Sequence, residues 1–199
     1  MYRRYVKRLL DAVLSVLMLA LLFWLFLIIA LAIKLDSRGP VFFTQTRIGK
    51  DEKPFRIIKF RTMRVNAPNE LATRLMQKSG AYITRVGRFL RMTSLDELPQ
   101  LINILKGDMS FVGFRPCLWN EYELDDERRA NGAYTVRPGI TGIAQIRGRD
   151  ELEPAEKAKL DGVYARHVGF DYDLRIITKT VFAVFYREGY KEGGDFGYE

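Results

Sequence analysis

The chain has 199 residues, a formal net charge of +8 and a single cysteine, and 48% of its residues are hydrophobic. An internal disulfide is excluded, so nothing points to an oxidising compartment, and we expect Cys117 to be a buried, inert thiol. The length suits one packed domain plus an apolar segment near the beginning of the chain, and the positive charge favours anionic partners. With such a segment present, phosphorylated substrates and anionic lipids are better candidates than nucleic acid, and we expect no nucleic-acid binding.

The apolar segment runs from residue 9 to residue 33. A helix of that length reaches about 37 Å, which exceeds a hydrocarbon core of about 30 Å. It is too long for a cleaved signal peptide and lacks a cleavage site of small residues. Asp11 is costly in lipid and should pair with a cation such as Lys7 or Arg8, or with one from the rest of the chain. Cations lie on both flanks, which suits a helix that enters and leaves the membrane on one side: Arg3, Arg4, Lys7, Arg8, Lys34 and Arg38.

Two strands are predicted next, at residues 41–45 and 55–62, with a bend at residues 49–52 between them. In the second strand, Lys59 and Arg61 share one face because side chains alternate along a strand. Two neighbouring cations indicate either an anion site or a solvated face. Residues 64–80 are polar and read as an exposed connection, with a helical turn around residues 70–78.

A helix beginning near Ile83 carries an apolar stripe on one side and arginines at every third position on another. Arg85 and Arg88 fit a solvated helix face. Arg91 stands five residues before Asp96 and is a candidate phosphate contact.

The stretch from Thr93 to Pro116 organises the chain. A helical stripe of Leu98, Leu101, Ile102 and Leu105 ends before Gly107, which is typical of a short core helix. Pro99 is tolerated only near the start of a helix, which places Asp96 at or next to the N-cap. An ionised carboxylate there has the chemistry of a nucleophile toward phosphorus or a ligand for a divalent ion. The alternative is that Asp96 only caps the helix and Glu97 only complements its dipole.

Beyond this helix we expect a short strand at residues 109–112, a solvated helix at 121–129, a glycine-rich loop at 137–149 and an amphipathic helix at 151–167. The loop lacks the ending of a P-loop and the setting of a dinucleotide fingerprint. A further helix at residues 174–186 is either a core helix or one lying in a membrane interface. Residues 189–199 are expected to form a loose tail.

The run SLDELPQLINILKGDMSFVG, followed by Arg-Pro and later by RPGITGIAQIRGR, resembles the monotopic phosphoglycosyl transferases, the bacterial sugar transferase family. The resemblance extends from Lys7 to about Tyr164. It implies an α+β fold in which residues 1–36 form a membrane-inserted, re-entrant helix. Residues 37–199 would form a small catalytic domain of amphipathic helices and short strands, docked on the membrane interface at the cytoplasmic face of the bacterial inner membrane.

The function implied by the resemblance is the initiating step of glycoconjugate synthesis. A phospho-sugar passes from a UDP-sugar to a membrane polyprenyl phosphate through a covalent aspartyl intermediate, which gives a polyprenyl diphosphate sugar and UMP. By the same resemblance, Asp96 and Glu97 are the catalytic residues and hold Mg²⁺. The implied substrate-binding residues are Lys59, Arg61, Arg91, Arg115, Arg137, Gln145 and Arg149.

The sequence departs from the family pattern at several positions. Phe23-Trp24 stands where the family has the Ser-Pro pair that breaks its helix, which removes the usual cause of a kink. Phe114 replaces the first proline of a Pro-Arg-Pro motif, Asp150 replaces an asparagine, and Pro154 stands where the family has tryptophan. Asp161 either pairs with an active-site arginine or forms a structural ion pair. The alternative function is a non-catalytic, membrane-anchored basic module that binds anionic lipid or a partner.

Overall fold

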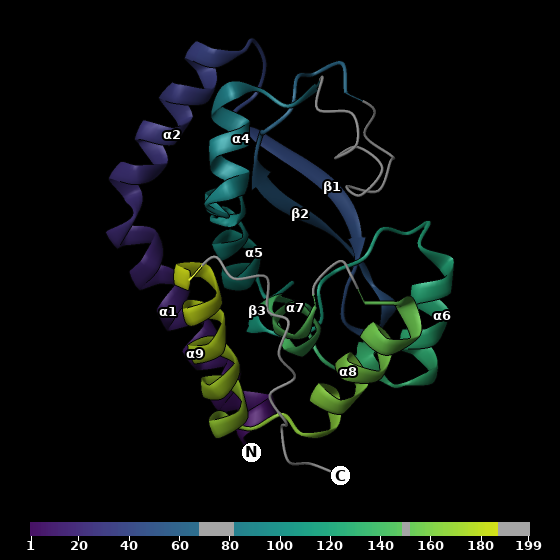
Figure 1. Ribbon diagram of the computed structural model, residues 1–199. Helices are drawn as coiled ribbons and strands as arrows, with labels where there is room; N and C mark the ends of the chain where they lie inside the picture. Colours follow the sequence, from purple (N-terminus) through teal and green to yellow (C-terminus); the bar gives the residue numbers. More distant parts are fainter. Residues whose placement is uncertain (68–81, 149–151, 187–199) are drawn as a thin grey trace.

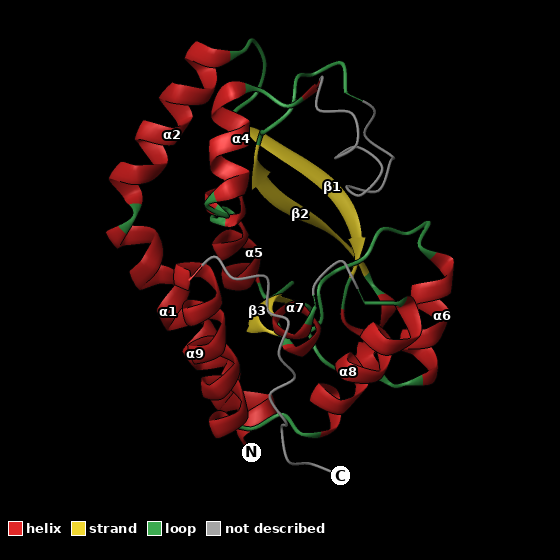
Figure 2. Cartoon of the chain, viewed as in Figure 1, coloured by secondary structure: helices red, strands yellow, loops and turns green. Residues whose placement is uncertain are grey.

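The computed structural model describes residues 1–67, 82–148 and 152–186. The described part is a mixture of helices and short strands (Figures 1 and 2). The longer helices and the strands are α1 (Lys7–Leu21), α2 (Phe23–Asp36), β1 (Phe42–Ile48), β2 (Pro54–Phe60), α4 (Arg85–Met92), α5 (Gln100–Lys106), β3 (Ser110–Val112), α6 (Tyr122–Ala130), β4 (Gly139–Thr141), α7 (Ile143–Arg147), α8 (Pro154–Arg166) and α9 (Phe170–Tyr186). Single turns of other helix types are η1 (Tyr2–Val6), η2 (Lys50–Glu52), η4 (Leu95–Glu97) and η5 (Ala133–Thr135).

The apolar segment forms two helices that meet at Leu22 and run along one side of the molecule (Figure 1). Among the described helices, none alone has the length and apolar composition to cross a membrane; Tyr2–Leu21 and Phe23–Asp36 together do, and they are bent by 62°. The pair is therefore bent, as the expected re-entrant form requires, although the chain lacks the Ser-Pro pair that is the usual cause of a kink. Tertiary packing accounts for the bend, because each half docks on a different part of the core. Met18 and Leu19 of α1 pack against the cluster around α5, whereas Ile29 and Ile33 of α2 pack against Phe60 and Leu90.

The β1–β2 hairpin is antiparallel, with Phe42 opposite Phe60 and Ile48 opposite Pro54. Its two strands and the bend at residues 50–52 lie close to the predicted positions. Phe60 joins the cluster under α2 and α4, whereas Ile57 joins the cluster around α5. The hairpin therefore lies between two sets of helices, because alternate side chains of β2 belong to different clusters.

Asn103 of α5 joins this helix to the hairpin. Its Oδ1 accepts a hydrogen bond from the backbone N–H of Ile58 at 2.9 Å, and its Nδ2 donates to the carbonyl oxygen of Arg56 at 2.8 Å. The helix ends at Gly107, whose φ of 95° is a left-handed conformation that glycine adopts without strain. This end is the one that the sequence predicts.

The glycine-rich segment is not simply a loop, which corrects the sequence interpretation. Residues 139–141 form β4, which pairs in parallel with β3, and one turn of helix, α7, follows. Gly113 and Gly139 allow this close pairing, since an added Cβ at Gly139 would lie 2.1 Å from the backbone nitrogen of Gly113. Gly142 also serves this backbone packing, since an added Cβ there would lie 2.0 Å from the carbonyl oxygen of Gly113.

Helices α6 and α8 pack together away from the bent helix pair (Figure 1). Arg128 of α6 and Asp161 of α8 form a fully buried ion pair at 2.8 Å, and the Arg128 guanidinium lies over the ring of Phe114. Of the two interpretations of Asp161, the structural ion pair is confirmed. Cys117 is buried, as predicted.

The start of α9 is joined to the start of the chain. Asp173 accepts hydrogen bonds from the hydroxyl groups of Tyr2 and Tyr164, and Lys7 contacts it at 2.6 Å. We expected Asp11 to pair with a cation such as Lys7 or Arg8. Instead, Lys7 contacts Asp173 directly. Arg8 donates hydrogen bonds to the carbonyl oxygens of Ile104 and Leu105 at the end of α5.

Candidate active site

The turn between α4 and α5 carries the two predicted catalytic acids. Ser94 adopts a left-handed conformation, with φ 57°, and reverses the chain after α4. Asp96 and Glu97 follow in the single turn η4, while α5 begins only at Gln100. The prediction that Asp96 stands at or next to the N-cap of the core helix is therefore wrong, because a separate turn precedes that helix.

Glu97 is held by two cations from distant parts of the chain. Its Oε1 accepts a hydrogen bond from Lys59 Nζ at 2.7 Å and from Arg115 Nη2 at 2.9 Å. Burial by itself would raise the pKa of Glu97, but the charges and hydrogen bonds of Arg115 and Lys59 outweigh it and hold the pKa well below its usual range. Glu97 is consequently a fixed anion that orients both cations.

Asp96 lies in a different environment from its neighbour. Its carboxylate takes part in no hydrogen bond or ion pair within the described residues. Burial raises the pKa of Asp96 and the negative charge of Glu97 adds to that shift, whereas the positive charges of Lys59, Arg91 and Arg115 oppose it. A half-buried carboxylate with nearby cations and no direct partner is suited to meet an anionic substrate, since the cations can bind the phosphate oxygens around it.

Arg91 approaches this site from the last turn of α4. Its Nε donates to Thr62 Oγ1 at 2.9 Å, which fixes the plane of the guanidinium. Nη1 is buried and has no hydrogen-bond partner in the described structure. Burial lowers the pKa of Arg91, and the charge of Asp96 opposes that effect. Such an unsatisfied donor is available to a phosphate oxygen.

Arg47 is a further cation near the site that the sequence interpretation missed. It lies on β1, donates to Gln45 Oε1 at 2.7 Å, and has a buried Nε without a partner among the described residues. Burial lowers the pKa of Arg47, the charges of Glu121 and Glu97 oppose that shift, and the charge of Arg115 adds to it. Arg47 lies opposite Phe55, and Phe55 is on the same face of β2 as Lys59 because alternate side chains of a strand point to the same side. Arg47 and Lys59 therefore occupy the same face of the hairpin. The predicted strand ended at residue 45; extending the alternation by two residues would have found Arg47.

Arg61 is not brought into this cluster. It is buried and donates to the backbone carbonyl oxygens of Arg38 and Ser37 and to the Ser37 hydroxyl. These contacts hold the segment that follows α2 in place, so Arg61 has a structural role. Its predicted contact with substrate stays a prediction.

The three remaining candidates come from the glycine-rich segment. Arg137 lies at the far end of α5, where its Nε donates to the Gly107 carbonyl oxygen at 2.8 Å. Gln145 lies on α7, and both polar atoms of its side chain are buried without a partner in the described part of the chain. Arg149 lies outside the described residues. The predicted group of substrate-binding residues is therefore divided: Lys59, Arg91 and Arg115 surround Asp96 and Glu97, whereas Arg137 does not.

Comparison with known proteins decides the family. The family model described as bacterial sugar transferase matches residues 2–187, which is nearly the whole chain. The chain belongs to the bacterial sugar transferase family. This confirms the resemblance, which was inferred from Lys7 to about Tyr164, and extends it at both ends, to include η1 and α9.

Curated relatives in the bacterial sugar transferase family carry related names. The chain is 44% identical to a UDP-glucose:undecaprenyl-phosphate glucose-1-phosphate transferase of Escherichia coli, over 92% of this chain and 40% of the relative. It is 44% identical to a protein of the same name in Caulobacter vibrioides, over 88% of this chain and 68% of the relative. It is 39% identical to the uncharacterized sugar transferase EpsL of Bacillus subtilis, over 94% of this chain and 90% of the relative. The chain thus spans well under half the length of the E. coli protein and most of EpsL.

The donor set at η4 fits the Mg²⁺ that the sequence resemblance leads us to expect. No group of three or more metal-ligating side chains occurs among the residues that the structure describes. Mg²⁺, however, is commonly bound by one or two carboxylates together with substrate phosphates and water. Asp96 offers a carboxylate without a hydrogen-bond partner in the described part, and Glu97 uses only Oε1 for its two cations. These two residues would hold the ion once a diphosphate is bound.

Proposed function

We propose that this chain transfers a phospho-sugar from a UDP-sugar to a membrane polyprenyl phosphate. The observation that carries the proposal is the position of Asp96, a carboxylate without a direct partner among the described residues and within the electrostatic reach of Lys59, Arg91 and Arg115. Membership in the bacterial sugar transferase family supports the reaction class. The names of the relatives make UDP-glucose and undecaprenyl phosphate the first donor and acceptor to test.

In the first step, a carboxylate oxygen of Asp96 attacks the phosphorus next to the sugar. The bond between that phosphorus and the oxygen bridging to the second phosphate breaks, and the electron pair leaves with UMP. An acyl phosphate then joins Asp96 to the sugar. Lys59, Arg91 and Arg115 bind oxygens of the diphosphate and stabilise the negative charge that develops on the leaving phosphate.

In the second step, a phosphate oxygen of the polyprenyl phosphate attacks the same phosphorus. The bond to Asp96 breaks, which restores the carboxylate and gives a polyprenyl diphosphate sugar. Mg²⁺ held by Asp96 and Glu97 would supply neutralisation of the diphosphate charge. Because a cation at this site favours the ionised form, the approach of positive charge also counteracts the effect of burial on the pKa of Asp96.

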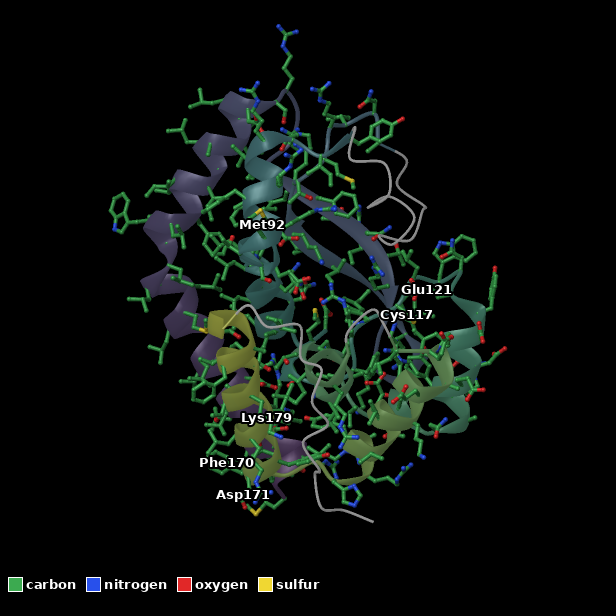
Figure 3. All side chains as sticks on the ribbon, in the orientation of Figure 1. Met92, Cys117, Glu121, Phe170, Asp171 and Lys179 are labelled. Carbon is green, nitrogen blue, oxygen red and sulfur yellow. The ribbon has the colours of Figure 1, made fainter. Side chains whose placement is uncertain are left out.

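The apolar surface of α1, α2 and α9 supports a position on a membrane. The side chains on the outer side of α1 and α2 are almost entirely carbon (Figure 3). The exposed apolar residues include Leu9, Val13, Leu17, Trp24, Ile28 and Leu31 of the bent pair and Phe170, Leu174, Val181 and Phe182 of α9. Exposed apolar surface of this extent indicates contact with lipid or another protein. A bent pair that enters and leaves on the cytoplasmic face of the inner membrane would keep the active site beside an acceptor whose isoprenoid tail remains in the bilayer.

The test combines turnover with detection of the intermediate. The chain is purified in detergent and given UDP-glucose, Mg²⁺ and undecaprenyl phosphate, and release of UMP is measured for the wild type, for Asp96→Asn and for Asp126→Asn. Asp126 is an exposed carboxylate on α6 and serves as the matched control. We expect UMP release by the wild type and the control, and a loss of at least about a thousandfold in Asp96→Asn. Intact-mass measurement after incubation with donor alone should show a phospho-hexose adduct on the wild type.

A non-catalytic basic module is the second candidate. Arg85 and Arg88 on α4 are exposed and would meet anionic lipid. No UMP release from any UDP-sugar by folded protein, together with binding to anionic vesicles, would favour this module. Turnover without an adduct on quenched, active enzyme would instead argue for direct transfer between the two substrates.

A further inference from the structure

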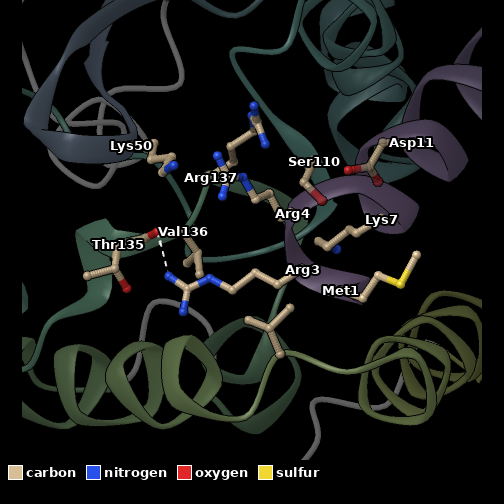
Figure 4. Close-up of a pocket in the computed structure, with 11 residues that line it drawn as sticks. Met1, Arg3, Arg4, Lys7, Asp11, Lys50, Ser110, Thr135, Val136 and Arg137 are labelled. Atoms are coloured by element: carbon tan, nitrogen blue, oxygen red, sulfur yellow. Dashed lines mark hydrogen bonds between the residues drawn. The ribbon is translucent and has the colours of Figure 1, made fainter.

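A cavity of about 500 Å³ lies where the beginning of the chain meets the soluble part of the fold (Figure 4). Its volume is in the range of small-molecule sites, about 300–1,000 Å³. The lining comes from η1, the start of α1, η2, β3, the segment before β4 and the connection between α8 and α9, and its charged residues are Arg3, Arg4, Lys7, Asp11, Lys50 and Arg137.

The cavity is strongly positive. Five of its lining residues are cations and one, Asp11, is an acid. Lys7 is neutralised by Asp173 at 2.6 Å, and Arg3 is held by the carbonyl oxygen of Thr135 at 2.7 Å. Asp11 is 5% exposed, and its carboxylate accepts a hydrogen bond from the backbone N–H of Phe111.

The other three cations of the cavity are Arg4, Lys50 and Arg137, of which Lys50 also lies 3.8 Å from the exposed carboxylate of Asp51. Arg4, Lys50 and Arg137 come from three separate segments and point into the same space (Figure 4). Arg137 is oriented by its bond from Nε to the Gly107 carbonyl oxygen, and its terminal nitrogens make no other hydrogen bond within the described residues. Arg4 takes part in a cation–π contact with Tyr5 and in no described hydrogen bond. Like charges are costly to bring together, so this arrangement favours an anion in the cavity.

The cavity is distinct from the Asp96 site. Arg137 is bound at Gly107, beyond the last residue of α5, and Arg8 contacts the carbonyl oxygens of Ile104 and Leu105 at the same end. Asp96 and Glu97 precede the first residue of that helix. A seven-residue helix separates its two ends by about 10 Å, and the two sites share no residue.

The cavity also adjoins the apolar surface. Tyr5 and Leu9, on the first turns of the apolar segment, are 61% and 65% exposed. Phe170 at the start of α9 is 55% exposed and contacts the ring of Tyr2 edge to face. Basic pockets at the boundary of a membrane-inserted segment meet the depth at which lipid phosphates lie.

We propose that this cavity binds a phosphate-bearing anionic group and that its occupant is the headgroup of an anionic membrane phospholipid. Arg4, Lys50 and Arg137 hold the phosphate oxygens by charge-assisted hydrogen bonds, and the acyl chains follow the exposed apolar side of α1. The bound lipid thereby anchors the beginning of α1 against the catalytic domain, at the opposite end of α5 from the reacting groups.

The test uses the full chain in a neutral detergent at constant ionic strength. Binding of dihexanoyl phosphatidylglycerol, dihexanoyl phosphatidylcholine and inorganic phosphate is measured on the wild type and on two double variants of equal charge. Arg4→Gln with Lys50→Gln removes two cavity cations that hold no backbone group. Lys53→Gln with Lys159→Gln removes two exposed cations outside the cavity. Thermal unfolding confirms that all three proteins are folded.

We expect phosphatidylglycerol to bind the wild type and the Lys53/Lys159 variant equally, and the Arg4/Lys50 variant at least about fivefold more weakly. UMP release in detergent should be the same in all three, and Asp96→Asn should bind phosphatidylglycerol as the wild type does. Equal binding by all three proteins, or equal loss in both variants, would overturn the cavity as the site. Binding of inorganic phosphate with this pattern, but not of phosphatidylglycerol, would overturn the lipid as its occupant.

Discussion

The ammonium nitrogen of Lys59 lies 2.7 Å from Oε1 of Glu97, across 38 positions of sequence. Asn103 makes this contact possible, since it fixes α5 to the backbone on both sides of residue 57. The pair leaves the two adjacent acids with different tasks. Glu97 balances two cations, whereas Asp96 has no direct partner in the described part of the chain.

Glu97→Gln should destabilise the fold at neutral pH by about 1–3 kcal/mol, because two charge-assisted hydrogen bonds are weakened. The pKa of Glu97 is held low in the folded state. Its contribution is therefore present above the pKa of an unfolded glutamate, about 4.3, and is lost as the pH falls toward the folded value. Denaturant unfolding at pH 7 and pH 4 measures this, and the difference between variant and wild type should shrink at pH 4. The exposed Glu123→Gln on α6 is the control and should change little at either pH.

Asp96→Asn should abolish turnover without lowering stability. Burial raises the pKa of Asp96 in the folded protein, so the fold is less stable with Asp96 ionised than with Asp96 protonated. The stability linked to this group is present below the pKa of an unfolded aspartate and is lost as the pH rises through the raised value. The neutral amide should therefore unfold at the same temperature as the wild type or a higher one at pH 7. A marked loss of thermal stability in this variant would contradict the environment described for Asp96.

The rate of adduct formation should fall as the pH is lowered through the raised pKa of Asp96, because only the ionised carboxylate attacks phosphorus. Glu97 remains ionised over the same range, so the loss should follow a single protonation. Single-turnover measurements with UDP-glucose between about pH 4.5 and pH 8 give the profile. A rate independent of pH over that range would show that Asp96 titrates below it.

Gly87→Ala should destabilise the protein by about 1–3 kcal/mol, although alanine is the better helix former. An added Cβ would lie 2.0 Å from the backbone oxygen of Thr62, and α4 would have to move away. The same shift would displace Arg91, whose Nε is bound to the Thr62 hydroxyl, so turnover should fall as well. Gly169→Ala is the control, because its nearest contact would be an ordinary 3.7 Å. Equal stability of the two variants would contradict the close packing of α4.

Asp161→Asn should cost about 3–5 kcal/mol, because it leaves the fully buried Arg128 without its counter-charge. Arg129→Gln, on the exposed side of the same helix, removes ion pairs that are about half exposed and should change stability much less, because solvent screens such pairs. Thermal unfolding of both variants checks the contrast. An unchanged substrate KM in the folded fraction of Asp161→Asn would agree with a structural ion pair.

Much of the fold is determined by local patterns. The alternation of β1 and β2, the stripe of α5, the glycine that ends it, and the amphipathic helices α4, α8 and α9 all follow from side-chain periodicity and turn chemistry. The run around Asp96 and Glu97 is equally local, which is why it was enough to predict the family. The resemblance placed Lys59, Arg91 and Arg115 among the candidates, and these cations lie near the two acids.

Only the tertiary structure decided how these residues are used. The sequence contains no proline at Leu22, yet the apolar helix bends there because its halves pack on different clusters. Arg61 and Arg137 were candidates for substrate binding together with Lys59. In the structure, Arg61 is bound to backbone carbonyl oxygens, and Arg137 lines a separate cavity. The ionisation of Asp96 was inferred from a helix end and depends instead on burial and on charges brought from β2, α4 and the segment after β3. Burial and long-range charge contacts exist only after the chain has packed, so no local pattern could specify them.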